Sequence, residues 1–124
     1  MSAKALRTVA LALVAAVTLA GCGSGTGSTV VPGGEAKRGR ALIASFGCGA
    51  CHVISGIAGA RGHVGPSLQH FESKGSIAGK LPNSPRSVER WIVDPQAIRP
   101  GTIMPVLGVS PQEARDITAY LYTQ

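Results

Sequence analysis

The stretch GCGACH, residues 47–52, decides how the rest of the sequence is interpreted. It places two cysteines, Cys48 and Cys51, three positions apart, and His52 follows the second directly. Cysteines at this spacing serve as a redox-active dithiol, as half of a zinc site or, with the following histidine, as the attachment point of a haem. Each alternative needs different partners elsewhere in the chain, so the remaining residues have to decide among them.

The rest of the sequence offers little support for zinc or dithiol chemistry. A structural zinc site takes four ligands, commonly supplied as two pairs, and the remaining candidates, His63 and His70, stand seven positions apart. A thioredoxin-like dithiol lies in a βαβ context, and no run of this sequence alternates convincingly as a strand. The haem is favoured, because thiols at this spacing can reach its two vinyl groups and His52 can then ligate the iron.

The domain around the motif is too small to fill its own centre. It has about ninety residues once the N-terminal segments described below are set aside, and the whole chain holds two Phe, two Tyr and one Trp. Domains of this size bury little apolar surface and are marginally stable. One covalently attached haem c, a large flat apolar ring, would supply the missing interior.

Met104 is the candidate for the second axial position on the iron. It is the only methionine besides the initiator, and it lies in PGTIMP, residues 100–105, where prolines and glycine predict an irregular loop. A thioether is a soft ligand, and His/Met ligation raises the potential of a haem. The alternatives are a methionine that only fills the core and a sixth ligand supplied by His63 or His70.

The N-terminal residues have the pattern of an export signal. Lys4 and Arg7 precede an apolar run over residues 8–20, which is too short for a settled transmembrane helix and is typical of a secretory signal. The run closes on Leu19-Ala20-Gly21-Cys22, which resembles a bacterial lipobox. We therefore predict a lipoprotein signal peptide over residues 1–21 and lipidation of Cys22. The alternative is an ordinary signal followed by a chance cysteine.

Residues 22–34 are rich in glycine and serine and carry no charge, which predicts a flexible tether. Residues 35–124 are expected to form the single folded domain. Together these assignments predict an exported protein, anchored by lipid to the bacterial cell membrane and facing the periplasm or the cell exterior.

The charge of the chain limits its expected partners. The formal net charge is +6, and removal of Lys4 and Arg7 leaves ten basic and six acidic side chains. No dense basic tract with interleaved aromatic residues is present, so nucleic acid is not an expected partner. The mild positive excess is either an ordinary solvated surface or a docking face for an acidic partner.

Apolar spacing and capping residues predict an all-α domain of three to four helices with long loops. One apolar stripe runs at helical spacing over residues 36–46, just before the motif. Ser84-Pro85 predicts the start of a second helix, which should end at Pro95. Ser110-Pro111-Gln112-Glu113 has the pattern of a capping box and predicts the start of a third helix. Two segments punctuated by glycine and proline are expected to be loops, residues 53–83 and residues 94–109. The first of them has room for one short helix near residues 66–71.

These residues resemble class I c-type cytochromes over essentially all of residues 35–124. The matches are Gly39, Ile43, Cys48-Gly-Ala-Cys51-His52, Gly65-Pro66-Ser67-Leu68, Met104-Pro105 and Tyr120. Three further runs are similar to the cytochrome c domain fused to some bacterial cytochrome c oxidase II subunits: residues 81–85, 90–96 and 99–101. This chain lacks the copper-binding domain and transmembrane helices of those subunits, so the module is expected to stand alone on its lipid.

The resemblance implies a small cytochrome c fold wrapped around one haem, with roles at the haem for some of the matched residues. Cys48 and Cys51 would form thioethers to the ring, and His52 and Met104 would be the axial ligands of the iron. The carbonyl of Pro66 would accept the ring N–H of His52, which fixes the tautomer of the imidazole.

The resemblance also implies neighbours of the ring and a helix crossing. Asn83 and Trp91 would lie near the propionates or the buried face of the ring. Gly39 would let the first and last helices cross closely near Tyr120. Ile43 departs from the aromatic residue that is common in the family, which should alter packing rather than ligation.

The function implied by the resemblance is that of a one-electron carrier rather than an enzyme. With both axial positions filled by protein, no small-molecule substrate is expected, and no catalytic acid, base or nucleophile is assigned. The expected partners of the monomer are a terminal oxidase as acceptor and a quinol-oxidising complex or a dehydrogenase as donor. Two alternatives stay open: a ligand-binding sensor or peroxidase-like enzyme in which Met104 is displaceable, and a fixed electron-relay subunit of a respiratory complex.

Overall fold

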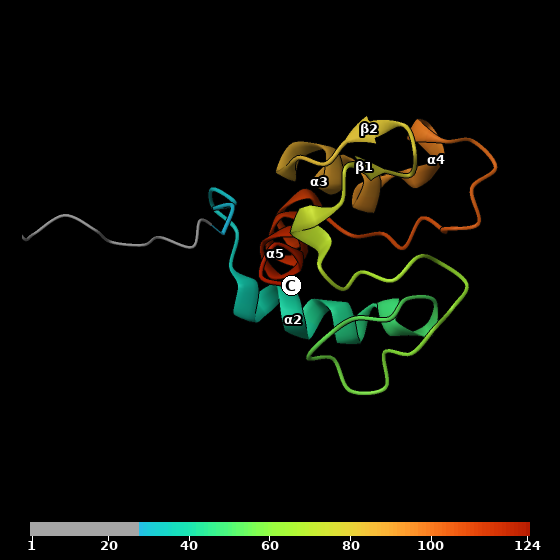
Figure 1. Ribbon diagram of the computed structural model, residues 1–124. Helices are drawn as coiled ribbons and strands as arrows, with labels where there is room; N and C mark the ends of the chain where they lie inside the picture. The colour runs from blue at the N-terminus through green and yellow to red at the C-terminus, as the bar shows by residue number, and fades with distance from the viewer. Residues whose placement is uncertain (1–27) are drawn as a thin grey trace, which may run out of the picture.

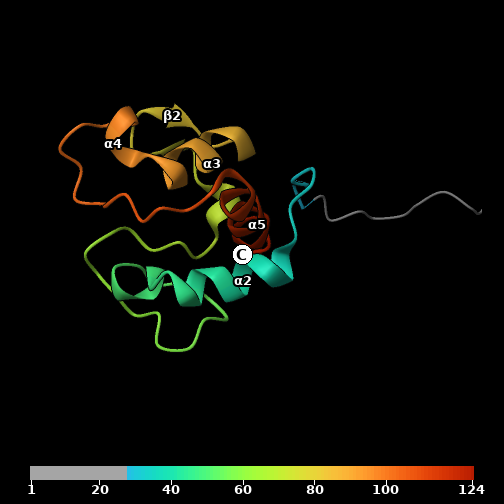
Figure 2. The ribbon, with the colours of Figure 1, turned by 180° about the vertical axis from the view of Figure 1, so that it is seen from behind.

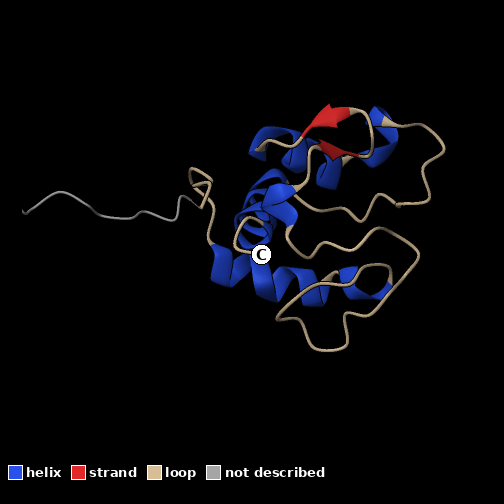
Figure 3. Cartoon of the chain, viewed as in Figure 1, coloured by secondary structure: helices blue, strands red, loops and turns tan. Residues whose placement is uncertain are grey.

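Four α-helices and one small hairpin make up the regular structure of the described residues. The computed structural model describes residues 28–124, so the expected signal peptide and Cys22 lie outside the described residues. The all-α class is confirmed, with long loops between short helices (Figure 3). The elements are α2 (Ala36–Ser45), η1 (Cys48–Ala50), η2 (Phe71–Ser73), β1 (Ser76–Ile77), β2 (Leu81–Pro82), α3 (Pro85–Val93), α4 (Pro95–Ile98) and α5 (Pro111–Leu121).

The last helix, α5, lies at the centre of the fold. Figures 1 and 2 show α2 on one side of α5 and α3 with the hairpin on the other. Gly39 of α2 is buried and approaches α5 so closely that an added Cβ would overlap the backbone carbonyl of Asp116. The close crossing expected at Gly39 is therefore present, about one helical turn before Tyr120. The core between these elements contains Ile43, Val88, Ile92, Ala114, Ile117 and Leu121.

Both predicted helix starts are confirmed. The hydroxyl of Ser84 accepts a hydrogen bond from the amide of Ser87 at 3.3 Å, directly before Pro85 begins α3. In α5 the Ser110 hydroxyl accepts from the Glu113 amide at 3.3 Å, and the Glu113 carboxylate accepts from the Ser110 amide at 2.8 Å. This reciprocal pair is a complete capping box, and it sets the start of the central helix.

The segments predicted as loops, residues 53–83 and 94–109, contain more regular structure than expected. Strands β1 and β2 pair in antiparallel fashion across a three-residue loop, Ala78-Gly79-Lys80. Ala78 and Gly79 both have positive φ, and the Lys80 amide donates to the Ile77 carbonyl at 3.0 Å, as in a type I′ turn. Helix α3 ends at Val93, before Pro95, as expected. Asp94 accepts from the Ala97 amide at 3.0 Å, so Pro95 also begins α4. The short helix expected near residues 66–71 is instead the 3-10 turn η2.

Residues 28–34, called the strap below, pack against the domain. The amide and hydroxyl of Thr29 donate to the Glu72 carboxylate at 2.7 and 2.5 Å, and these bonds lower the pKa of Glu72. Val31 is 6% exposed, and Gln112 of α5 donates to a strap carbonyl at 2.9 Å. The sequence predicts a tether that extends to residue 34, whereas residues 28–34 are attached to the folded domain. They are attached because the apolar Val31 is buried and because Glu72 and Gln112 form hydrogen bonds with the strap.

Two long loops project on the side of the molecule away from the strap. In Figure 1 they are the green loop that follows η1 and the orange loop between α4 and α5. The first is braced by a bridge between Val53 and Arg61 and by the Leu68 amide, which donates to the Val53 carbonyl at 2.9 Å. Among residues 28–124, no helix has the length and apolar character needed to cross a membrane.

Candidate functional site

A cavity of about 510 Å³ lies between the two long loops and the helices behind them. It brings together residues that are far apart in the sequence, because its lining includes Cys48, Cys51, His52, Trp91 and Met104. Its volume is within the range of cofactor sites. The apolar part of the lining includes Phe46, Leu68, Phe71, Ile77, Val88, Ile92 and Leu121.

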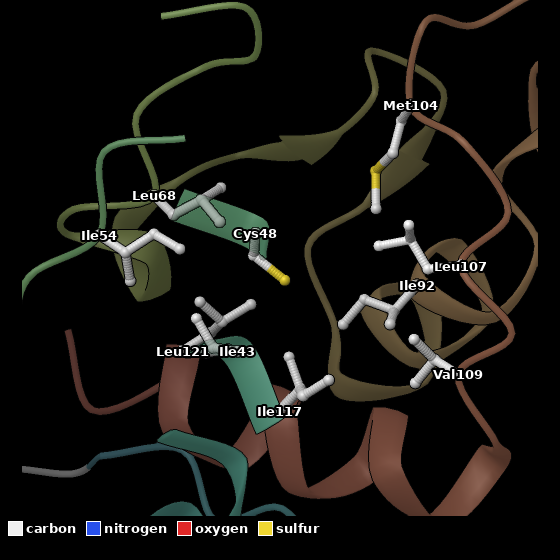
Figure 4. Close-up of a pocket in the computed structure, with 10 residues that line it drawn as sticks. All are labelled: Ile43, Cys48, Ile54, Leu68, Ile92, Met104, Leu107, Val109, Ile117 and Leu121. Atoms are coloured by element: carbon white, nitrogen blue, oxygen red, sulfur yellow. The ribbon is translucent and has the colours of Figure 1, made fainter. Parts of the chain in front are cut away.

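A smaller apolar pocket of about 50 Å³ shares Cys48 and Met104 with this cavity. Figure 4 shows the Cys48 sulfur and the Met104 thioether directed toward the same space from opposite sides. Ile43 of α2 and Ile117 of α5 also line this space, so it continues into the helical core. The two sulfur atoms therefore face an apolar interior.

The cysteines lie on a tight turn as free, half-buried thiols. Gly47 enters this turn with a φ of 70°, which side-chain-bearing residues rarely adopt. The amides of Cys51 and His52 both donate to the Cys48 carbonyl, at 3.2 and 3.1 Å. Burial raises the pKa of the Cys48 thiol, a backbone hydrogen bond partly opposes this rise, and the nearby Cys51 adds to it. Cys48 is therefore a neutral thiol at neutral pH.

The His52 ring is fixed by the loop that follows the motif. Its Nδ1 lies 2.7 Å from the carbonyl oxygen of Pro66. Because a carbonyl only accepts, Nδ1 of the neutral ring carries the proton and Nε2 keeps a free lone pair. A Cβ added at Gly65 would overlap the imidazole, and the Gly65 amide donates to the Cys51 carbonyl at 2.8 Å. Only glycine lets the loop approach the ring this closely.

Met104 reaches the cavity from the loop between α4 and α5. It is half-buried, while Ile103 and Pro105 on either side are exposed. Its backbone carbonyl accepts a hydrogen bond from the side-chain amide of Gln96 at 3.1 Å. Sequence analysis assigned Gln96 no role, because nothing in a short proline-flanked segment indicates which loop its amide will contact.

The two expected neighbours of the ring lie in different places. Trp91 lines the cavity, as the resemblance implied. Asn83 does not line it: its amide donates to the Phe71 carbonyl at 2.8 Å, and its oxygen accepts from the Tyr122 hydroxyl at 2.6 Å. Tyr122 also packs edge-on against the Phe71 ring, with centroids 5.7 Å apart. Asn83 thus supports the aromatic pair behind the cavity, a position that the sequence did not reveal.

The alternative iron ligands lie elsewhere. His63 and His70 are exposed, and neither lines the cavity. Over the described range 28–124, no group of three or more His, Cys, Asp or Glu side chains is arranged to hold a metal ion.

The residues of the cavity fit a covalently attached haem. Two free thiols and the free Nε2 of His52 lie together in the lining, and the Met104 thioether enters from the opposite side. The space between them is apolar and large enough for a cofactor. Lys74 and Arg99 also contribute to the lining and offer positive charge to carboxylates. A helical fold with this lining is that of a haem-binding electron-transfer domain.

Comparison with known proteins agrees with this class. The family model described as cytochrome c matches residues 36–124. The chain therefore belongs to the cytochrome c family, as a class I c-type cytochrome. A cytochrome c oxidase subunit 2 from Alkalihalophilus pseudofirmus is 33% identical over 87 residues, which are 69% of this chain and 25% of that relative. The chain thus spans about a quarter of the relative's length. No solved structure matches the chain.

Membership of the family establishes the general role of the chain. A cytochrome c domain carries haem c, bound covalently and containing iron, and works in electron transfer. The resemblance inferred from the C-x-x-C-H and the residues around it is confirmed at this level.

Proposed function

We propose that the chain is a membrane-tethered one-electron carrier that holds one haem between His52 and Met104 and passes electrons to a terminal oxidase. The observation that carries this proposal is the shared cavity, whose lining joins the C-x-x-C-H to Met104 of a distant loop. A thioether directed into the space beside a C-x-x-C-H histidine supports the proposal that Met104 would be the second ligand of the iron.

The residues of the chain would both hold the group and adjust its potential. Cys48 and Cys51 would attach the ring. The Pro66 carbonyl accepts a hydrogen bond from Nδ1–H of His52, which keeps the proton on Nδ1 and leaves Nε2 free to ligate. The haem, when bound, supplies reversible exchange of one electron at its iron. The apolar lining excludes water, and burial together with a thioether ligand raises the potential. With protein ligands on both axial positions, we expect no substrate at the iron and no enzymatic turnover.

The rim of the cavity suits brief contact with another redox protein. Exposed Val64, Ile103 and Leu107 contribute to the lining, as do the basic residues Lys74 and Arg99. Redox encounters use small interfaces, below about 1,200 Å². A terminal oxidase as acceptor is supported by the relative, which is a cytochrome c oxidase subunit. A quinol-oxidising complex or a dehydrogenase would then supply the electrons.

The proposed membrane tether is supported by the lipobox-like residues 19–22 at the end of the apolar N-terminal run. A lipid on Cys22 would place the exported domain on the periplasmic or outer face of the cell membrane. Tethering raises the effective concentration of a carrier near integral complexes, which suits short-lived contacts.

Replacing Met104 tests the proposed ligation. Met104→Ala should keep the haem covalently attached but lower the midpoint potential by on the order of 0.1 V or more, since axial ligands set haem potentials over a range of about 0.8 V. The reduced variant should also bind carbon monoxide rapidly. Redox titration and flow kinetics measure the two effects.

Val106→Ala is the matched control, because Val106 is an exposed apolar residue of the same loop and does not line the cavity. It should leave the potential and the rate of carbon monoxide binding unchanged. An unaltered potential in Met104→Ala would contradict the ligand assignment. Rapid carbon monoxide binding by the unmodified protein would favour a ligand-binding sensor or a peroxidase-like enzyme.

A further inference from the structure

One side-chain amide makes three hydrogen bonds to the backbone of the methionine loop. Nε2 of Gln96 donates to the Thr102 carbonyl at 2.8 Å and to the Met104 carbonyl at 3.1 Å. Oε1 of the same side chain accepts from the Gly101 amide at 3.0 Å. Both amide hydrogens and the oxygen are therefore used, and the pattern of two acceptors and one donor fixes the orientation of the amide.

The loop has little else to hold it. In the part of the chain that the structure describes, the bond from Gln96 to Met104 is the only hydrogen bond that reaches any of residues 103–109. Ile103 and Val106 are 76% and 54% exposed, so they add little packing. The place of the Met104 backbone relative to the cavity therefore depends on Gln96.

Gln96 itself stands on a firm base. It belongs to α4, whose first turn is capped by the Asp94 carboxylate, and the Arg99 amide donates to the Pro95 carbonyl at 2.9 Å. The helix follows α3 directly and contacts it. A rigid element thus presents the amide to a loop whose residues 103–109 make no other hydrogen bond in the described part of the chain.

We propose that Gln96 is the positioning residue for Met104: by binding the Met104 carbonyl it keeps the thioether directed into the cavity and limits how often the iron opens to outside ligands. The inference rests on the proposed function, since it takes Met104 as the axial ligand. Glutamate in place of Gln96 would keep the length and the acceptor for Gly101. It would, however, turn a carboxylate toward two carbonyls that need donors.

The test compares Gln96→Glu and Gln96→Ala in the holoprotein. Loss of the bonds to the loop should raise the rate of carbon monoxide binding to the reduced protein about tenfold, which corresponds to about 1.4 kcal/mol in the equilibrium for release of Met104. The ferric absorption band of iron–thioether coordination should weaken in both variants. Amide exchange at Gly101 should rise about tenfold in Gln96→Ala only, because a glutamate still accepts that bond.

Gln112→Ala is the control for a general loss of stability. Gln112 also bonds through its amide nitrogen, but to the strap and to Asp116, and it does not line the cavity. This variant should unfold at a lower temperature and keep the carbon monoxide kinetics of the unmodified protein.

The outcomes separate the inference from the proposed function. If the unmodified protein shows the thioether band and both Gln96 variants bind carbon monoxide as slowly as it does, the positioning role is overturned while His/Met ligation stands. If the unmodified protein binds carbon monoxide as fast as Met104→Ala, ligation by Met104 is wrong and the positioning role is overturned with it. An unchanged rate of amide exchange at Gly101 in Gln96→Ala would likewise refute the positioning role of Gln96.

Discussion

Gly65 shows how one residue without a side chain can control a ligand. Gly65→Ala should push the His52 ring away from its place, because the new Cβ would overlap the imidazole. The hydrogen bond from His52 to Pro66 would then break, and the iron would lose its proximal ligand in part of the molecules. The absorption spectrum and the yield of holoprotein report this change, which should be a loss of more than half of the normally ligated form.

Gly75→Ala is the matched control, because no atom lies within 4 Å of a Cβ added there and its φ is not positive. It should give the normal spectrum and yield. Normal ligation in Gly65→Ala would mean that the loop can move aside without consequence, contrary to the contact seen here.

The residues of the site differ in how much of their role the sequence reveals. The spacing of Cys48, Cys51 and His52 limits their chemistry to a few alternatives, and Met104 is the only methionine besides the initiator and lies between prolines. Gln96 and Asn83 act through bonds to backbone groups that lie near them only in the folded chain. No local pattern encodes such partners, so their positions could not be derived from the sequence.

At the scale of elements, Asp116 joins α5 to the start of α2. Its carboxylate is almost fully buried and accepts from the Glu35 amide at 2.9 Å, from Arg38 at 2.6 Å and from Gln112 at 3.1 Å. Burial alone raises the pKa of Asp116, but these hydrogen bonds and the charge of Arg38 outweigh it, so the pKa is lower than usual. The ionised form is thus the one that the fold favours.

Asp116→Asn should lower the free energy of unfolding at neutral pH by about 2 kcal/mol, since hydrogen bonds to charged groups contribute about 1.5–3 kcal/mol. Because the folded pKa is lowered, the contribution of Asp116 is present above its unfolded pKa of about 3.9 and is lost as pH falls through the folded value. The gap between variant and parent should therefore close in acid. Denaturant unfolding at several pH values measures it.

Glu89→Gln removes a carboxylate of α3 that makes no ion pair in the described residues, and it serves as the control for loss of charge. It should leave the pH dependence as in the parent. A gap between Asp116→Asn and parent that stays constant down to acid pH would show that Asp116 contributes by shape and not by charge.

The elements were predictable where their signals are local. The caps at Ser84 and Ser110 and the apolar stripe before the motif each act within a few residues, and all three helices formed where expected. The hairpin was missed because its strands are two residues long and its three-residue loop, Ala78-Gly79-Lys80, lacks the usual Asn-Gly signal. Helix α4 was missed because a proline that ends one helix can also begin the next.

At the scale of the whole molecule, the proposed lipid on Cys22 is separate from folding and haem binding. Cys22→Ser should release the holoprotein into the soluble fraction and leave its visible spectrum and midpoint potential unchanged, because Cys22 precedes residues 36–124, which the cytochrome c family model matches. Fractionation followed by spectroscopy measures both properties. Intact mass of the membrane-extracted parent should show one haem together with acyl groups.

Lys37→Ser replaces an exposed residue of α2 and is the control for protein that detaches from the membrane during fractionation. This variant should stay with the membrane, as the parent protein does. Retention of washed Cys22→Ser on the membrane would show that another contact holds the protein there. A permanent place in a respiratory complex would then be the better description.

The fastened strap has a geometric consequence for such an anchored molecule. Only five residues lie between Cys22 and Ser28, where the strap begins, and the six residue-to-residue steps span about 20 Å at most when fully extended. The span between the proposed lipid and the fastened strap is therefore short compared with that of a tether that extended unattached to residue 34. A protein anchored in this way would reach its partners by lateral diffusion along the membrane surface. It could bind only those partners whose docking faces lie close above the lipid headgroups.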